Sequence, residues 1–116
     1  MDQSTFAELE KCGVDTKATL ARFGGSAKLY ERFLGKFLND PSFSQTIEAL
    51  GKGDFAAVLT AAHTLKGVSG NLGLTPVYEI SAKMVDSIRA GDNAGAAELQ
   101  GRLTEAYNSI CAVLRT

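Results

Sequence analysis

Apolar residues recur at intervals of three and four along almost the whole chain. This spacing places them on one face of an α-helix, which turns once in about 3.6 residues. Runs in which β-branched and polar residues alternate, the usual mark of strands, are missing from the sequence. The pattern therefore predicts an all-α fold.

Glycine and proline residues followed by capping side chains divide this pattern into segments. Helices are predicted over about residues 5–11, 15–24, 26–38, 42–51, 54–73 and 75–91, and from 92 to the C-terminus, with a kink or break at Pro41. The predicted N-caps are Thr5 and Ser42, in capping boxes with Glu8 and Gln45, and also Asp15, Ser26, Asp54, Thr75 and Asp92. Short connections make consecutive helices antiparallel, so we expect an up-down four-helix bundle covered at one end or side by short N-terminal helices.

Composition fits one globular domain over residues 1–116, with 45% hydrophobic and 22% charged residues. A net charge of -1 gives no broad basic surface for nucleic acid or anionic lipid. Because neither a membrane span nor a secretory signal is visible, we expect a cytoplasmic protein, and a bundle of this size can be monomeric. Cys12 and Cys111 are expected to be free, buried thiols.

The segment from Ala61 to Gly73 contains the single histidine, His63. With about 100° between residues, a helical projection gathers one set of residues on the face opposite His63: Val58, Ala61, Leu65, Val68 and Leu72. The same projection places a second set within about 60° of His63: Ala56, Leu59, Thr60, Lys66, Gly67 and Gly70. His63 is therefore predicted to point away from the core.

Two glycines, Gly67 and Gly70, follow His63 on its own face, although each costs about 1 kcal/mol in a helix interior relative to alanine. We interpret them as clearance that lets another protein approach the imidazole, rather than as sites of close helix packing. Leu59, Thr60 and Leu74 are the predicted partner contacts on this face. Lys66 would suit a ring that becomes anionic when phosphorylated, and a neutral imidazole is nucleophilic near physiological pH.

The run His63-Thr64-Leu65-Lys66-Gly67, followed by Ser69-Gly70-Asn71-Leu72-Gly73, resembles the signature of bacterial and fungal histidine-phosphotransfer (HPt) domains. Gly24-Gly25, Gly53-Asp54 and Arg89-Ala90-Gly91-Asp92 extend the resemblance over most of the chain. It implies that a response-regulator receiver domain, which carries the magnesium, or a hybrid sensor histidine kinase docks here. The receiver's aspartate would exchange a phosphoryl group with His63 in a two-component phosphorelay. Lys66 would steady that group, and Ser69 or Asn71 would tune packing or hydrogen bonding.

Some HPt domains place a polar residue of the neighbouring helix against the histidine, but the corresponding position here is Val85. Lys83, Asp86 or Arg89 could line the site instead, or could be ordinary solvated residues. The alternative function is a helical adaptor that binds a response regulator or kinase without phosphate. Autonomous kinase activity, a cofactor and a metal site are not expected, because the chain has no phosphate-binding loop and too few metal ligands.

Overall fold

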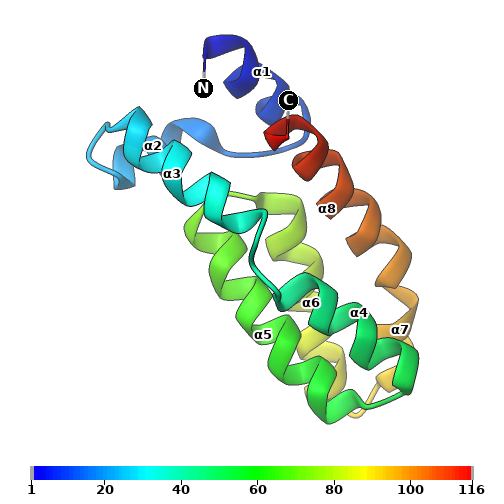
Figure 1. The fold of residues 1–116 in the computed structure, drawn as a ribbon. Helices are drawn as coiled ribbons and strands as arrows, with labels where there is room; N and C mark the ends of the chain where they lie inside the picture. The colour runs from blue at the N-terminus through cyan, green and yellow to red at the C-terminus, as the bar shows by residue number, and fades with distance from the viewer. Residues whose placement is uncertain (1, 116) are drawn as a thin grey trace.

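The computed structural model describes residues 2–115, and all of its regular elements in that range are α-helices, as predicted (Figure 1). In chain order they are α1 (Gln3–Lys11), α2 (Thr16–Arg22), α3 (Ala27–Phe37), α4 (Ser42–Lys52), α5 (Phe55–Asn71), α6 (Thr75–Arg89), α7 (Asn93–Glu98) and α8 (Gln100–Leu114).

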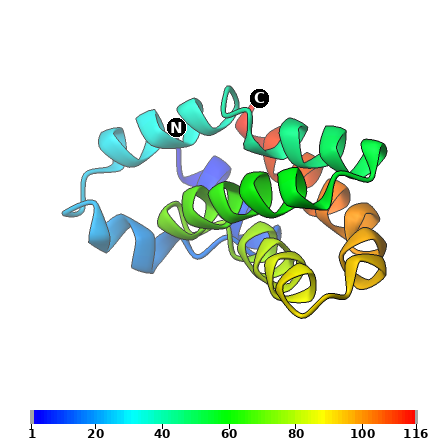
Figure 2. The same ribbon diagram turned by 90° about the horizontal axis from the view of Figure 1, so that it is seen from below.

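The long helices form a bundle in which α5 is central, packed against α4 on one side and α6 on the other. α8 packs against α6 and α4, while α3 and α4 follow each other end to end with a break before Ser42 (Figure 2). α1 packs on α8, and α2 lies beside α1 and α3, at the end of the bundle where the two termini meet (Figure 1). The predicted bundle, its covering helices and the break near Pro41 are confirmed.

Four of the predicted N-caps are confirmed. The side chains of Asp15, Ser26, Asp54 and Asp92 each accept a hydrogen bond from the backbone N–H three residues further along the chain. An oxygen in this position satisfies one of the N–H groups that a helix start leaves without a partner. Asp54 thereby fixes the first turn of α5, the helix that carries His63.

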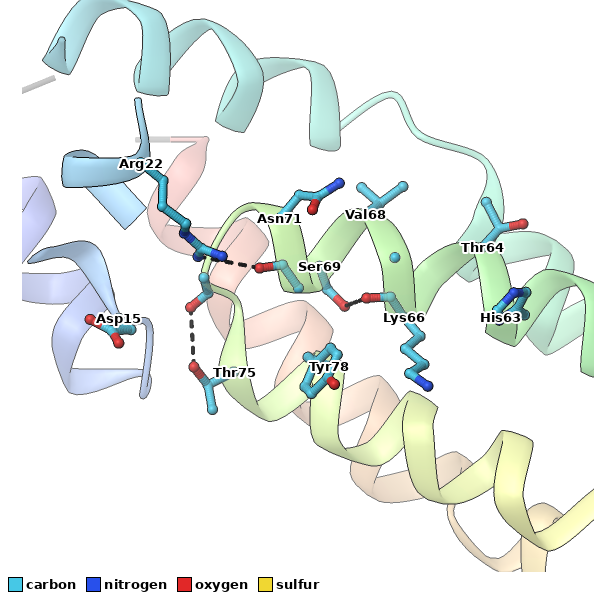
Figure 3. A pocket seen from close by; sticks show the side chains of 13 residues that line it. Asp15, Arg22, His63, Thr64, Lys66, Val68, Ser69, Asn71, Thr75 and Tyr78 are labelled. Atoms are coloured by element: carbon cyan, nitrogen blue, oxygen red, sulfur yellow. Dashed lines mark hydrogen bonds between the residues drawn. The ribbon is translucent and has the colours of Figure 1, made fainter. Parts of the chain in front are cut away.

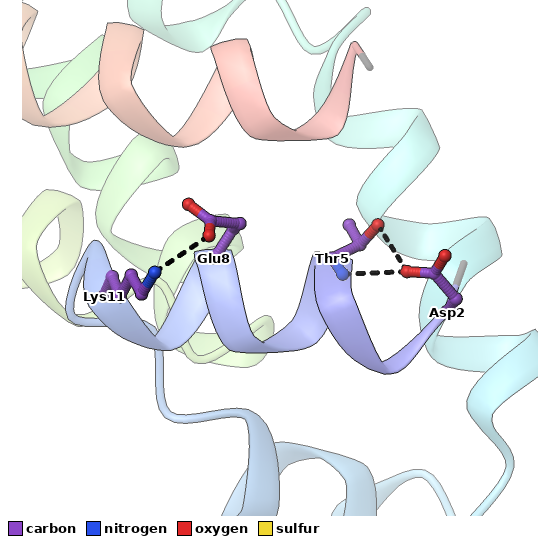
Figure 4. Close-up of polar contacts among 4 residues, drawn as sticks. All are labelled: Asp2, Thr5, Glu8 and Lys11. Atoms are coloured by element: carbon purple, nitrogen blue, oxygen red, sulfur yellow. Dashed lines mark hydrogen bonds and ion pairs between the residues drawn. The ribbon is translucent and has the colours of Figure 1, made fainter.

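The predicted capping box of Thr5 and Glu8 is wrong. α1 begins earlier, at Gln3, because the Asp2 carboxylate accepts the Thr5 N–H at 2.9 Å (Figure 4). That hydrogen bond lowers the pKa of Asp2 below its usual value. Glu8 pairs instead with Lys11 at 3.0 Å, one turn further along the helix (Figure 4).

Ser42 and Thr75 also differ from the prediction, because each is the first helical residue rather than the N-cap. The Ser42 N–H binds the Asp40 carboxylate at 2.9 Å, and the Thr75 hydroxyl donates to the Gly73 carbonyl at 3.3 Å. The predicted last helix is divided at Leu99, whose N–H bonds to a carbonyl only three residues back, at Ala96. Such a tightened turn is typical of a helix end.

The buried ring of Tyr30 joins the N-terminal helices to the end of α5. Its hydroxyl donates to the Leu72 carbonyl at 2.8 Å, and its ring stacks with Phe6 and Phe23. Burial raises the pKa of Tyr30 to about 12. Because this pKa is higher in the folded state, the associated stability is complete below the unfolded value of 10.0 and is lost as the pH rises through about 12.

Replacing Tyr30 with phenylalanine is expected to lower the free energy of unfolding by about 1–3 kcal/mol, because the buried Leu72 carbonyl loses its hydroxyl donor. Urea unfolding followed by circular dichroism measures this change. Tyr78→Phe is the matched control, since Tyr78 is exposed and its hydroxyl makes no hydrogen bond within residues 2–115. Equal stability of the two variants would contradict the role given to the Tyr30 hydroxyl.

The two cysteines are free thiols, as predicted, but only Cys111 is fully buried. Burial raises the pKa of the Cys111 thiol. Cys12 is half-buried, with its Sγ 3.8 Å from the Ser109 carbonyl oxygen, so its predicted full burial is wrong. The half-exposure of Cys12 follows from its place at the C-cap of α1, on the outside of the bundle.

Candidate functional site

His63 lies in the middle of α5 and its side chain is exposed. The opposite face of the helix is buried against the bundle, as the helical projection predicted for Val58, Ala61 and Leu65. Val68 departs from that prediction, because it is only half-buried and forms part of a surface depression. The confirmed result is that the imidazole stands outside the core.

His63 borders an open depression of about 780 Å³ between α5, α2 and the start of α6 (Figure 3). Its lining comes from two stretches of the chain that are distant in sequence, residues 15–22 and 63–78: Asp15, Arg22, His63, Thr64, Lys66, Gly67, Val68, Ser69, Gly70, Asn71, Gly73, Thr75 and Tyr78. Most residues of the run from His63 to Gly73, which resembles the HPt signature, therefore line this depression.

The imidazole makes no hydrogen bond or ion pair with any residue between 2 and 115. Two neighbouring hydroxyls on the same helix are engaged elsewhere, because Thr60 donates to the Ala56 carbonyl at 3.3 Å and Thr64 to the Thr60 carbonyl at 3.1 Å. Lys66 is half-buried, three residues along α5 from His63, and its side chain extends away from α5 toward α6 (Figure 3). Both ring nitrogens are therefore available to an incoming group.

Gly67 has open space around it, as the clearance interpretation requires. A side-chain carbon built at Gly67 would have open space around it, with no other heavy atom within 4 Å. The glycine is exposed and sits one turn along α5 from His63. That this open space admits a partner surface to the imidazole stays a prediction.

Gly70 has a different role from the one predicted. A side-chain carbon there would lie 2.9 Å from a ring atom of Tyr78, which reaches over from α6 (Figure 3). The absence of a side chain at Gly70 therefore accommodates the Tyr78 ring rather than a partner protein. The interpretation of Gly70 as clearance is wrong because the projection of α5 alone contains no information about the neighbouring helix.

Leu74, predicted as a partner contact, is fully buried in the core, so that prediction is wrong. The helical projection fails there because α5 ends at Asn71 and the chain then turns through Gly73, whose φ is +72°. Only glycine adopts such a φ readily. Leu59 is half-buried and packs against the core, which leaves only part of its side chain for a partner. Thr60 is exposed, as expected.

Within residues 2–115, no side chain of the neighbouring helix α6 forms a hydrogen bond with the imidazole. Val85, at the position where some HPt domains have a polar residue, is buried. Lys83, Asp86 and Arg89 are exposed but do not line the depression that contains His63. The α6 residues that do line it are Thr75 and Tyr78, and the sequence reasoning placed neither of them at the site.

Ser69 is buried, and its hydroxyl donates to the Leu65 carbonyl at 2.6 Å and to the Lys66 carbonyl at 3.2 Å. These bonds satisfy the hydroxyl within α5 itself. Asn71 is exposed at the end of the helix, on the rim of the depression. That Ser69 or Asn71 tunes packing or hydrogen bonding stays a prediction.

Arg22 is the functional candidate that sequence reasoning missed. It lies in the last turn of α2, and its guanidinium Nη2 donates to the Gly70 carbonyl at 3.4 Å and to the Thr19 hydroxyl at 3.1 Å (Figure 3). Its contact in α5 is 48 residues away along the chain. The sequence pattern around Arg22 does not predict a contact so distant along the chain.

Across residues 2–115, no three histidine, cysteine, aspartate or glutamate side chains form a group that could hold a metal ion. In the same range, none of the helices has both the length and the apolar character required to cross a bilayer. The chemistry that the depression itself offers is that of an exposed imidazole with a lysine beside it.

Residues 37–113 match the family model of the Hpt domain, which is more than half of the chain. The chain therefore belongs to the Hpt domain family. Hpt domains are helical phosphocarriers of two-component signalling that interact with receiver domains and kinases. The search of curated proteins found no significant match, and the search of solved structures found none.

Proposed function

We propose that this chain relays a phosphoryl group between aspartates of receiver domains, with His63 as the carrier. The observation that supports this most is the exposed imidazole, which bonds to no residue between 2 and 115 and lies one helical turn from the open space at Gly67. A nucleophile that must meet a second protein needs that access. Membership of the Hpt domain family supports phosphotransfer in general.

In the forward step, an unprotonated nitrogen of His63 attacks the phosphorus of an aspartyl phosphate. A nitrogen–phosphorus bond forms, the bond between phosphorus and the carboxyl oxygen breaks, and the receiver's carboxylate leaves. In the return step, a carboxylate of another receiver attacks the phosphohistidine and the imidazole leaves. The receiver supplies the magnesium, and the chain supplies the nucleophile and the access to it. On this proposal the protein is a carrier without kinase activity of its own.

The test is to incubate the protein with phosphorylated receiver domains, one at a time. Label that is lost in acid but survives base, and that maps to His63, is the expected result. Absence of such label with every receiver would favour the alternative, an adaptor that binds without phosphate. Labelling of His63 by ATP alone would contradict the statement that the chain is only a carrier.

Lys66 is expected to interact with the phosphoryl group on His63. Lys66→Ala should slow transfer, or shorten the lifetime of the phosphorylated form, by about fivefold, because a charged contact at a partly exposed site contributes about 1 kcal/mol. Rapid-quench labelling measures the rate, and decay of isolated phosphoprotein measures the lifetime. Lys83→Ala is the control, since Lys83 is an exposed lysine of α6 outside the depression. Indistinguishable rates and lifetimes for both variants would make Lys66 an ordinary surface charge.

A further inference from the structure

A second depression, of about 490 Å³, adjoins the one that contains His63. The two share Arg22, Val68 and Asn71, so they form one continuous hollow surface. The second depression lies between α2, α3 and the end of α5, and its lining is mainly aromatic and basic: Arg22, Phe23, Phe33, Lys36, Phe37, Asp40, Val68, Asn71 and Leu72.

The residues that give this surface its character precede the part of the chain that matches the family model, which begins at residue 37. Arg22, Phe33 and Lys36 all belong to the earlier segment, in α2 and α3. The structure thus joins a segment outside the family match to the face that displays His63. A surface formed by residues outside the family match can give one Hpt domain different partners from another.

Two cations on this surface have no acidic partner among residues 2–115. Arg22 donates only to uncharged oxygens, those of Thr19 and Gly70. The Lys36 ammonium lies 5.1 Å from the ring centroid of Phe33, with no ion pair. Such cations can pair with the acidic side chains of a protein that docks there.

The acidic residues at the edges of the same surface are already engaged. The Asp15 carboxylate accepts the Ala18 N–H at 3.2 Å, and the Asp40 carboxylate accepts the Ser42 N–H at 2.9 Å. Both thereby serve the starts of their own helices. Within residues 2–115, neither carboxylate forms an ion pair with Arg22 or Lys36.

Two of the three large apolar side chains that are exposed in the described part of the chain belong to this hollow surface. The three are Leu29, Phe33 and Tyr78, at 36%, 38% and 39% exposure. Phe33 lines the second depression and Tyr78 the first. Aromatic groups with charges at the periphery are the usual composition of a protein–protein interface.

We propose that Arg22, Phe33 and Lys36 form a second contact area for the receiver domain that exchanges phosphate with His63. Arg22 and Lys36 pair with acidic side chains of that receiver, and Phe33 packs against an apolar one, so the area selects among receivers. This proposal rests on the proposed function of His63.

The size of a protein interface supports a receiver as the occupant. Gly70, which Arg22 contacts, is seven residues from His63, or about 10 Å along the helix at 1.5 Å per residue. A specific interface covers about 800 Å² on each partner, a patch roughly 30 Å across. A domain centred on His63 would therefore also cover the surface around Arg22, which borders the second depression.

The test compares two double variants with the same change in net charge. Arg22→Glu/Lys36→Glu reverses both cations of the proposed contact area. Lys17→Glu/Arg32→Glu reverses two exposed cations of the same helices, α2 and α3, that line neither depression. The probe is the phosphorylated receiver domain that labels His63 fastest when receivers are tested one at a time. The readout is kcat/KM for phosphoryl transfer.

The first double variant is expected to lower kcat/KM by about tenfold or more, through a higher KM, and to weaken the dependence of transfer on salt. The control variant should stay within about twofold of the unaltered protein. Equal slowing of both variants, or unchanged transfer by the first, would overturn the proposal. Two single variants, Lys36→Glu and Phe33→Ala, should each raise KM as well. Neither side chain makes a hydrogen bond within residues 2–115, so both variants are expected to fold.

Phosphoramidate, a small phosphoryl donor, separates failure of this proposal from failure of the proposed function. It is expected to label His63 equally in all of these variants, because it needs no docking surface. If no receiver labels the unaltered protein, the relay function itself fails, and with it the second contact area. If receivers label all variants at the same rate, only the second contact area is wrong.

Discussion

Replacing His63 with glutamine is expected to reduce phosphoryl acceptance to background, from receivers and from phosphoramidate alike. Glutamine keeps a polar side chain of similar reach but has no nucleophilic ring nitrogen. The fold should survive, because the imidazole is exposed and bonds to no residue between 2 and 115. The free energy of unfolding should therefore change by about 0.5 kcal/mol or less. Labelling followed by phosphoamino-acid analysis, together with thermal unfolding, measures both effects.

Thr64→Ala is the matched control for His63→Gln. Thr64 is the exposed neighbour of His63, and its hydroxyl is occupied by the Thr60 carbonyl. Its removal should leave labelling unchanged. Label that persists in His63→Gln would place the acceptor on another side chain and would remove the basis of the proposed relay.

Replacing Gly67 with glutamine is expected to slow transfer from a receiver by about a hundredfold, because a misplacement of about 1 Å between reacting groups can cost that much. The long side chain would fill the open space through which a partner reaches His63. The helix itself should gain up to about 1 kcal/mol of stability from the loss of glycine. Transfer kinetics should show a lower rate for this variant, and urea unfolding should show a higher free energy of unfolding.

Gly101→Gln tests whether this effect is local. Gly101 is also a helical glycine with open space around it, but it lies in α8, away from the depression. That variant should be stabilised to a similar extent and should transfer at the normal rate. Phosphoramidate should still label Gly67→Gln, because a small donor does not need the cleared surface. Normal transfer by Gly67→Gln would contradict the clearance interpretation.

Much of the fold could be predicted from the sequence because its determinants are local. The period of apolar residues defines helices, and Asp15, Ser26, Asp54 and Asp92 mark helix starts by hydrogen bonds within one turn. The prediction was wrong at α1 for a local reason too. Asp2 and Thr5 could both cap that helix, and the charged carboxylate of Asp2 does so.

In the candidate site, too, some features could be predicted from a local pattern and others could not. The exposure of His63 and the open space at Gly67 follow from one face of one helix, so the helical projection was sufficient. The position of Leu74 did not follow, because the projection continued past the point where α5 ends. Whether a residue remains on a helix face depends on where the helix stops.

Contacts between helices were beyond the sequence argument. Tyr78 fills the space at Gly70, and Arg22 reaches the end of α5 from a helix 48 residues earlier in the chain. Which side chains meet there depends on how α2, α5 and α6 pack, and a periodic pattern in one helix does not specify its neighbours. These residues are also the ones that shape the depression beside His63.

α5 packs between α4 and α6, and His63 lies on an exposed part of this helix. In a relay through His63, the donor receiver and the acceptor receiver would compete for the same binding surface. They could not be bound at the same time. The first protein must leave before the second arrives, so a very tight complex would stall the flow of phosphate. Fast dissociation, rather than high affinity, would then set the throughput of the carrier.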